Sequence, residues 1–306
     1  MKVSIITPSL NQAPFIERSI QSVLAQQWRP LEHIVFDGGS TDGTLDILKK
    51  YNGQLRWVSE PDKGQSDAVN KGLRTATGDV IGWLNSDDIY YPGAVKLAAE
   101  FLAAHPELDA VYGMADYIAD DDSIIDSYPT EPWHFPRLKD VCFICQPALF
   151  LRRSVFERHG YLDTDLHYCM DYEYCLRLGR AGVRFGYLET KLAGARMYVG
   201  NKTISGRTEA YTEMIEMFRR SFGTVPDSWL FGYAHMIAKK RPDVDEHPTR
   251  FLFEKGVRSI GAALRWNRSI SPNMIYRLLR GIPKKLLGRE EKQTSTIGSK
   301  PSWWWN

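Results

Sequence analysis

The sequence predicts an α/β fold built on a mostly parallel sheet flanked by helices. Short apolar runs typical of buried strands alternate with longer segments of helical periodicity, a pattern that gives βαβ units. The chain has 306 residues, 43% hydrophobic and 25% charged, which is enough for one large domain or two smaller ones. The C-terminal part of the chain is basic and helix-prone, and we expect it to form a helical extension of the α/β fold.

The expected elements follow one another in a regular order. Strands are predicted at residues 3–6, 33–36, 55–58, 80–84, 110–113 and 149–152. Helices are predicted at residues 12–26, 44–51, 65–75, 93–105, 171–181 and 207–222, and a short one from Ser154, which has capping-box spacing with Glu157. Residues 120–122 are three aspartates between apolar runs, and a solvated hairpin tip explains them better than a metal site.

Cysteine usage and hydropathy narrow the class of protein. The four cysteines are too few for a disulfide scaffold, and Cys142 and Cys145 lack the second half of a zinc-finger pattern, so reduced core thiols are expected. The N-terminus does not have the features of a signal peptide, and no apolar stretch reaches the roughly 18 residues of a membrane span. We therefore expect a cytoplasmic protein, and no nucleic acid among its partners.

The charge is distributed unevenly along the chain. Residues 250–306 hold 12 Lys and Arg and 3 acids, whereas residues 1–249 hold 27 Lys and Arg and 34 acids. Apolar residues recur at helical spacing in residues 273–287, between basic ones. This segment is expected either to pack on the enzyme body or to lie on anionic lipid at the inner face of the cell membrane, where Trp303–Trp305 could also anchor.

An apolar run at residues 80–84 ends directly in Asp87 and Asp88. Ligands of open α/β sheets bind at the carboxyl ends of the strands, and paired carboxylates there suit Mg²⁺ or Mn²⁺ with a phosphate group. The alternative is a polar loop in which Asp88 caps a helical turn. Thr7, Pro8 and Asp37 end two other predicted strands and are expected at the same edge. The glycines after Asp37 have neither the P-loop ending nor the G-x-G-x-x-G spacing.

Four motifs in this order resemble those of the family 2 glycosyltransferases, which have the GT-A (Rossmann-like) fold. They are residues 7–11 (TPSLN), 37–44 (DGGSTDGT), 67–72 (DAVNKG) and 85–88 (NSDD). The resemblance implies a catalytic domain at residues 1–225, a helical basic region at residues 226–306, and a role of the type found in bacterial surface-polysaccharide assembly. It also implies a metal-dependent, inverting transfer from a nucleotide-sugar to a saccharide or lipid-linked saccharide acceptor.

The resemblance assigns most of the donor site. It implies Mn²⁺ or Mg²⁺ as cofactor, with Asp88 as direct ligand and Asp87 as the ribose or second metal contact, and a UDP-sugar in preference to a GDP- or dTDP-sugar. The residues expected to contact the nucleotide-sugar are Thr7, Pro8, Asn11, Asp37, Gly38, Lys63, Asn70, Ser86 and Asp87. Many relatives have a second acid, which reads the base, where this chain has Gly38, and a His where it has Tyr198. Asp37 or the backbone must then read the base, and Tyr198 leaves the metal one ligand short or contacts the diphosphate.

The same resemblance extends to residues 170–178, where Asp171 takes the place of the catalytic base of inverting members and Met170 replaces the usual Glu. Glu173 lies two residues further and would face elsewhere on a helix. Without the resemblance, N-capping would be the simpler explanation of Asp171. The expected acceptor contacts are Trp133, His134, Phe135, Gln146 and Tyr168, although such aromatics more often belong to the core.

Two other classes of function remain open from the sequence. A nucleotidyltransferase would need a Gly-rich N-terminal loop with a basic residue, which residues 7–14 lack. A non-catalytic protein that binds nucleotide-sugars would not need a base at Asp171.

Overall fold

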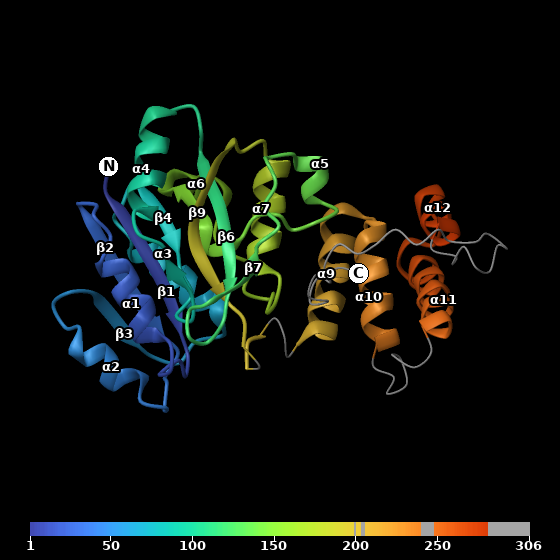
Figure 1. The fold of residues 1–306 in the computed structure, drawn as a ribbon. Helices are drawn as coiled ribbons and strands as arrows, with labels where there is room; N and C mark the ends of the chain where they lie inside the picture. The colour runs from blue at the N-terminus through green and yellow to red at the C-terminus, as the bar shows by residue number, and fades with distance from the viewer. Residues whose placement is uncertain (199, 203–205, 240–247, 281–306) are drawn as a thin grey trace, which may run out of the picture. The chain divides into compact units, whose positions relative to one another are not determined.

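The computed structural model describes residues 1–198, 200–202, 206–239 and 248–280, and the chain divides into two compact units, residues 1–205 and 206–306 (Figure 1). We expected the boundary between the two domains near residue 225, which lies 20 residues beyond this division. That residues 1–225 form the catalytic domain stays a prediction.

The first unit is built on one mixed sheet in the strand order β3-β2-β1-β4-β8-β6-β9-β5. Strands β1 (Val3–Ser9), β2 (Leu31–Asp37), β3 (Arg56–Ser59) and β4 (Val80–Trp83) pair in parallel. Strand β8 (Leu149–Arg152) is antiparallel to both β4 and β6 (Ala110–Ile118), so that β6 and its parallel neighbour β9 (Phe185–Arg196) run in the direction of β1. The short strand β5 (Ile89–Tyr90) closes the order against β9, and β7 (Ile124–Ser127) forms a hairpin with β6. The predicted α/β fold with a mostly parallel sheet is confirmed.

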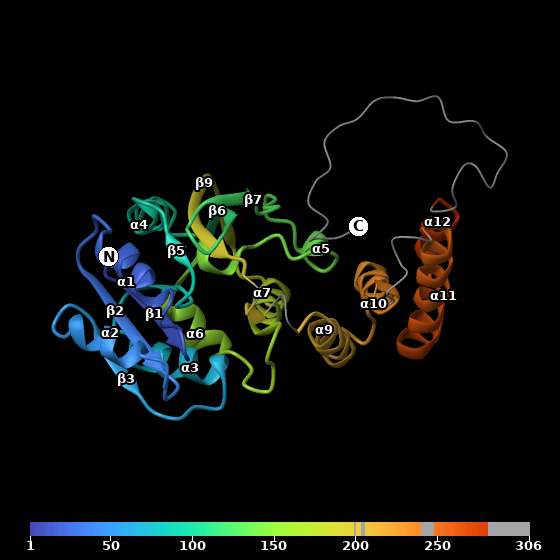
Figure 2. The same ribbon diagram turned by 60° about the horizontal axis from the view of Figure 1, so that its bottom comes forward.

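Helices cover both faces of this sheet. Figure 2 shows α1 (Ile16–Leu24) and α4 (Ala94–Ala104) on one face, and α3 (Gln65–Thr75) and α6 (Arg153–His159) on the other. The other helices among the described residues of this unit include α2 (Thr44–Lys50), α5 (Phe135–Leu138), the 3₁₀ turn η1 (Gln146–Ala148) and α7 (Met170–Arg180). Helix α1 buries Ile16, Ile20 and Val23, which recur at helical spacing. On the other face α3 lies so close to β1 that a Cβ added at Gly72 would be 2.3 Å from Ile6 Cγ2.

Two expectations about the elements are wrong. The first helix begins at Ile16 rather than directly after Asn11, because residues 11–15 form a turn in which Asn11 has a φ of 53°. The prediction also missed β9, a strand of 12 residues whose middle is exposed and polar at Glu189 to Lys191. Its ends are apolar, but its centre lacks the alternation by which strands are identified.

The second unit consists of helices α9 (Arg207–Phe222), α10 (Asp227–Lys239), α11 (Pro248–Asn267) and α12 (Pro272–Arg280) among its described residues. Its core contains the fully buried Trp229 and Phe218. Asp227 at the start of α10 accepts hydrogen bonds from Ser271 and Asn273, which joins α10 to the start of α12. The expected amphipathic segment falls partly on α12; residues 281–287 and Trp303–Trp305 lie outside the described residues. None of the helices described is long and apolar enough to cross a membrane.

Candidate active site

The carboxyl ends of β1, β2 and β4 lie side by side at one edge of the sheet. Ser9 at the end of β1 is in register with Asp37 at the end of β2, and β1 also pairs with β4 directly before the Asn85–Asp88 turn. Strand β9 ends at the same place, since the backbone N–H of Arg196 donates to Asp88. The topology therefore gathers the side chains that the motifs identified.

Asp37 is engaged by its own turn. Its Oδ2 accepts from the backbone N–H groups of Gly39 (3.0 Å) and Ser40 (2.9 Å) and from Ser59 Oγ (2.7 Å), while Oδ1 accepts from Ser40 Oγ. The side chain is also almost completely buried. Asp37 thus holds the turn after β2 in place, which leaves its carboxylate little capacity to bind a nucleobase.

A different acid lies beside Gly38. A Cβ added at Gly38 would be 2.6 Å from Asp62 Oδ2, so the Asp62 carboxylate fills the space that a side chain at position 38 would take. Its other oxygen accepts from the N–H of Gly64 at 2.8 Å. Sequence reasoning missed Asp62, because nothing in the local pattern shows that residues 38 and 62 meet.

Thr7 and Ser9, near the carboxyl end of β1, have different surroundings. Thr7 is fully buried and its hydroxyl is 2.9 Å from His33 Nε2, so its side chain belongs to the core. Ser9 is 5% exposed, and its hydroxyl has no hydrogen-bond partner among the described residues. A buried hydroxyl without a partner is costly, and at a strand end it suits a ligand that supplies the missing bond.

Asn11 and Asn70 use their side-chain amides to hold backbone. Asn11 Oδ1 accepts from the N–H of Thr41 (2.9 Å), which fixes the turn after β2. Asn70 on α3 donates to Leu162 O (2.9 Å) and accepts from Leu162 N–H (3.0 Å), and is buried. Both side chains therefore hold neighbouring backbone in place, although Asn11 is exposed and Asn70 is buried; Lys63 is exposed on the loop before α3.

Asn85 joins the Asn85–Asp88 turn to the neighbouring elements through hydrogen bonds of its side chain. Its Nδ2 donates to Asp88 Oδ2 (3.1 Å) and Gln146 Oε1 (3.0 Å), and its Oδ1 accepts from Gln65 Nε2 (2.8 Å) and Trp83 Nε1 (2.9 Å). A carboxylate at position 85 could accept two of these bonds but donate neither of the others. This explains in physical terms why an amide takes the first position of this motif here.

Asp87 and Asp88 form a pair of carboxylates in a dry environment. Burial raises the pKa of Asp88 well above its usual range, and the neighbouring Asp87 raises it further. Burial also raises the pKa of Asp87. Ser86 between Asn85 and Asp87 is buried as well. Two adjacent carboxylates whose charges are poorly solvated are a donor set that a hard divalent cation fits.

The protein supplies few ligands for such a cation. Among the residues that the structure describes, no three His, Cys, Asp or Glu side chains gather as a metal cluster. A cation at Asp87 and Asp88 would take its other ligands from water and phosphate oxygens, as Mg²⁺ commonly does. The hairpin tip expected at residues 120–122 forms where β6 turns into β7; Asp120 and Asp121 are exposed, whereas Asp122 is half-buried and paired with two arginines.

Tyr198 occupies the place where a further metal ligand was considered. Its hydroxyl donates to Asp87 Oδ2 at 3.3 Å and accepts from Gln12 Nε2 at 3.3 Å. Burial, followed by the charge of Asp87, raises the pKa of Tyr198 to about 12, so this hydroxyl stays a donor at neutral pH. Its ring packs on Phe15, with centroids 4.7 Å apart.

Asp171 lies in the first turn of α7 and lines a small, mostly apolar cavity of about 30 Å³. Gln146 lines the same cavity and connects it to the turn, since it accepts from Asn85 and donates to Trp83 O. Glu173 is buried in an ion pair with Arg177 (3.0 Å) and does not line the cavity. Burial raises the pKa of Cys142, on the cavity wall, to about 12, which keeps it a thiol.

The expected acceptor residues are dispersed. Trp133 stacks on Phe185, with ring centroids 4.0 Å apart, and also contacts Phe135. Phe185 begins β9 whereas Arg196 ends it, so this aromatic cluster lies at the opposite edge of the sheet from Asp88. Packing accounts for Trp133 and Phe135, and His134 is exposed beside them. Tyr168 is half-buried beneath Lys202, with Nζ 5.5 Å from the ring centroid.

Comparison with known proteins matches residues 4–160 to the model of Glycosyl transferase family 2. An uncharacterized glycosyltransferase of Mycobacterium tuberculosis is 34% identical over 179 residues, which are 57% of this chain and 68% of the relative. The crystal structure of S. aureus TarS in complex with UDP-GlcNAc has a TM-score of 0.61 at 18% identity, covering 84% of this chain and 80% of that one. A mannosyltransferase from Pyrobaculum calidifontis in complex with GDP-Man and Mn²⁺ has a TM-score of 0.57 at 19% identity, covering 93% and 80%. At these identities the solved structures establish the fold.

Proposed function

Because this chain belongs to Glycosyl transferase family 2, it is a glycosyltransferase that uses a nucleotide-sugar donor, and we propose that it transfers the sugar with inversion and with the help of a divalent cation. The acceptor in this proposal is a saccharide or a lipid-linked saccharide. The nucleotidyltransferase and the non-catalytic alternatives lose their support, since neither is a member of this family.

One observation supports the mechanism above the others: Gln146 connects the two groups of acids. It is bonded to Asn85 of the Asn85–Asp88 turn and lines the cavity that Asp171 also lines. A leaving diphosphate at the turn and an attacking hydroxyl at Asp171 would then lie on either side of one amide. This arrangement suits a direct displacement at the anomeric carbon.

The proposed chemistry divides between these two groups. Asp171 accepts the proton of the acceptor hydroxyl as the new C–O bond forms, and the bond from the anomeric carbon to the diphosphate oxygen breaks. A divalent cation at Asp87 and Asp88 would stabilise the negative charge of the departing diphosphate. Tyr198 holds the Asp87 carboxylate in position through its hydroxyl. A single displacement of this kind inverts the anomeric carbon.

We further propose that Asp62 reads the nucleobase, in place of an acid at position 38. Its Oδ2 lies against Gly38 at the edge of the sheet, whereas Asp37 is engaged by its own turn. A carboxylate accepts hydrogen bonds, so it favours a base with a ring N–H on its pairing edge, such as uracil, thymine or guanine. The nucleotide-sugars bound in the two solved structures, UDP-GlcNAc and GDP-Man, contain uracil and guanine, which are bases of this kind.

The helices of the second unit support a lipid surface as partner. Exposed apolar side chains of α11 include Phe253, Val257 and Leu264, which share one helix face by their spacing. Helix α12 exposes Ile275, Tyr276 and Leu279. Exposed arginines on both helices add positive charge, so we propose an anionic membrane surface as the place where this enzyme meets a lipid-linked acceptor.

The test of the proposed function is Asp171→Asn with a nucleotide-sugar and Mn²⁺. Donor binding, measured by calorimetry, should stay the same, while sugar transfer or slow donor hydrolysis should fall by about 10²- to 10⁴-fold. Asp165→Asn, an exposed aspartate on the preceding loop, is the matched control and should keep full activity. Retention of the anomeric configuration in the product, read by proton NMR, or full activity of Asp171→Asn would refute the assignment.

A further inference from the structure

The buried Arg196 joins the Asn85–Asp88 turn to the β6–β7 tip (residues 119–123). Its backbone N–H donates to Asp88 Oδ1 at 2.8 Å, and its Nε donates to the backbone carbonyl of Asp87 at 2.6 Å. Its other two guanidinium nitrogens donate to the tip, to Ala119 O and Asp122 Oδ1. The Arg196 side chain is fully buried, so the tip supplies the charge partner it requires.

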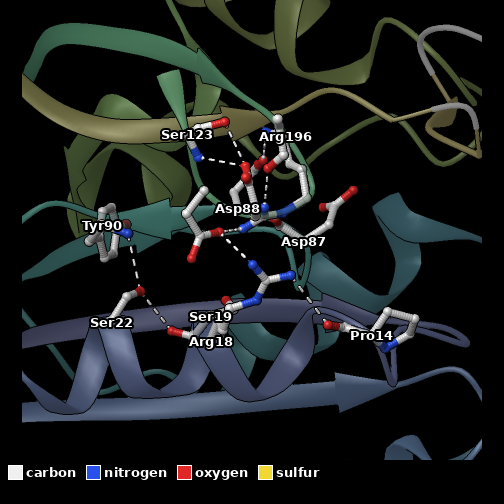
Figure 3. Close-up of polar contacts among 12 residues, drawn as sticks. Pro14, Arg18, Ser19, Ser22, Asp87, Asp88, Tyr90, Ser123 and Arg196 are labelled. Atoms are coloured by element: carbon white, nitrogen blue, oxygen red, sulfur yellow. Dashed lines mark hydrogen bonds and ion pairs between the residues drawn. The ribbon is translucent and has the colours of Figure 1, made fainter. Parts of the chain in front are cut away.

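Asp122 holds two arginines at once. Figure 3 shows Arg18 of α1 and Arg196 of β9 converging on the same part of the structure, and both donate to Asp122 Oδ1, Arg18 at 2.9 Å. Both guanidinium groups also lie over the ring of Phe15, 5.4 Å and 4.9 Å from its centroid. Asp122 has a φ of 71°, which fits the tight turn from which it reaches them.

The position of the Arg196 guanidinium decides what Asp87 and Asp88 can bind. It contacts the main-chain carbonyl of Asp87, and its side-chain bonds avoid the carboxylates of both Asp87 and Asp88. Without Asp122, the buried guanidinium would lack a carboxylate partner, and Arg196 already contacts Asp88 through its backbone N–H and Asp87 through its Nε. A bidentate pair with either of them would take up the oxygens that a cation needs.

We propose that Asp122 is a positioning residue that keeps Arg196 away from the carboxylates of Asp87 and Asp88, so that both remain available to a divalent cation. This inference rests on the proposed metal-dependent function. It assigns to the β6–β7 tip a role in metal binding without making its aspartates metal ligands.

The test measures Mn²⁺ binding directly, by the loss of the electron paramagnetic resonance signal of free Mn²⁺, in the full-length protein at constant pH. Asp122→Asn should raise the dissociation constant by about tenfold or more, the range typical of residues that orient metal ligands. Asp122→Glu keeps the carboxylate and should restore most of the affinity. Asp121→Asn is the matched control, because the Asp121 carboxylate accepts only from Ser123 of the same tip in the part of the chain described, and it should bind as the wild type does.

The outcomes separate the inference from the function it rests on. A wild-type protein that binds no Mn²⁺ refutes the proposed metal site itself. Wild-type affinity in Asp122→Asn refutes the inference, even if its melting temperature has fallen, since a purely structural role would change stability alone. If Asp122→Asn does not fold, Arg18→Gln is measured instead, because it removes the half-exposed arginine that also binds the Asp122 carboxylate. An unchanged dissociation constant for Mn²⁺ in that variant overturns the inference.

Discussion

Gly38 and Asp62 are distant in the sequence but adjacent in the structure, where Asp62 fills the space that a side chain at position 38 would take. The carboxylate at residue 62 occupies the space beside position 38, where the sequence left the reading of the base to Asp37 or the backbone. No pattern in the sequence predicts this contact, because it depends on how the loop before α3 returns to the end of β2. Asp37 was found from the sequence as a strand-end acid, but its three hydrogen bonds to the turn and its bond to Ser59 of β3 became visible only in the structure.

An exchange of the acid between these positions tests the proposal for the base. Asp62→Ala should weaken donor binding by about 1–3 kcal/mol, the loss typical of a hydrogen bond to a charged group. Gly38→Asp alone should also weaken binding, since its Cβ would lie 2.6 Å from Asp62 Oδ2. The double variant should bind more tightly than either single one, measured by calorimetry with the donor. Additive losses in the double variant would contradict the exchange.

Asn85 provides the second prediction at this scale. Asn85→Asp removes the donations to Asp88 and Gln146 and adds a third carboxylate, so it should destabilise the protein by about 1–3 kcal/mol in urea unfolding. Asn52→Asp is the control, because exposed Asn52 only accepts, from Trp57 Nε1, and an aspartate can do the same. Equal stability of the two variants would contradict the connecting role of Asn85.

At the scale of elements, strands and helices with regular periodicity were predictable and others were not. The strands at β1, β2 and β4 and the helices at α2 and α3 agree with their predicted residues to within a few positions. Helix α1 starts later than predicted because Asn11 and Gln12 bind the turn after β2 through their backbone N–H groups, to Ser40 and Thr44. These long-range hydrogen bonds hold residues 11 and 12 in a turn, although the sequence pattern that follows Asn11 favours a helix.

The exposed faces of α11 and α12 carry a prediction of their own. The protein should sediment with vesicles that contain anionic lipid and remain in solution with zwitterionic ones. Phe253→Ser, which replaces a side chain that is 75% exposed, should reduce binding while leaving the helix content in circular dichroism unchanged. Ile124→Ser, 59% exposed on β7, is the control and should bind as the wild type does. Equal sedimentation with both kinds of vesicle would refute the lipid partner.

At the scale of the whole molecule, the stability of the protein should decrease in acid because of His33. Burial lowers the pKa of His33 to about 3, whereas in the unfolded chain it is near 6.5. Below pH 6.5 the unfolded state takes up a proton that the folded state does not, so stability falls as the pH falls towards 3. The slope from this group is about 1.4 kcal/mol per pH unit.

The variant His33→Gln keeps a partner for Thr7 and should lose this part of the slope, which urea unfolding between pH 4.5 and 7.5 measures. His105→Gln, which changes a half-exposed histidine at the C-terminal end of α4, is the control and should leave the slope unchanged. If His33→Gln and the wild type show the same dependence on pH, the buried histidine is not its source.

The family and the fold were predictable at this scale because four motifs occur in one order. The contacts that hold the fourth motif were not predictable, since they come from the end of β9, a strand that the sequence pattern did not indicate. Arg196 illustrates the point: none of the four motifs includes it, yet its hydrogen bonds join Asp87 and Asp88 to the β6–β7 tip.

The bond between Arg196 and Asp88 also bears on how the protein is made. These residues are 108 positions apart in the chain, and β9 is the last strand of the sheet to leave the ribosome. The Asn85–Asp88 turn is therefore synthesised long before the residue that holds it. A nascent chain that stops before β9 has both carboxylates but not the residue that anchors them, so we expect the proposed donor site to form only when the first unit is almost complete.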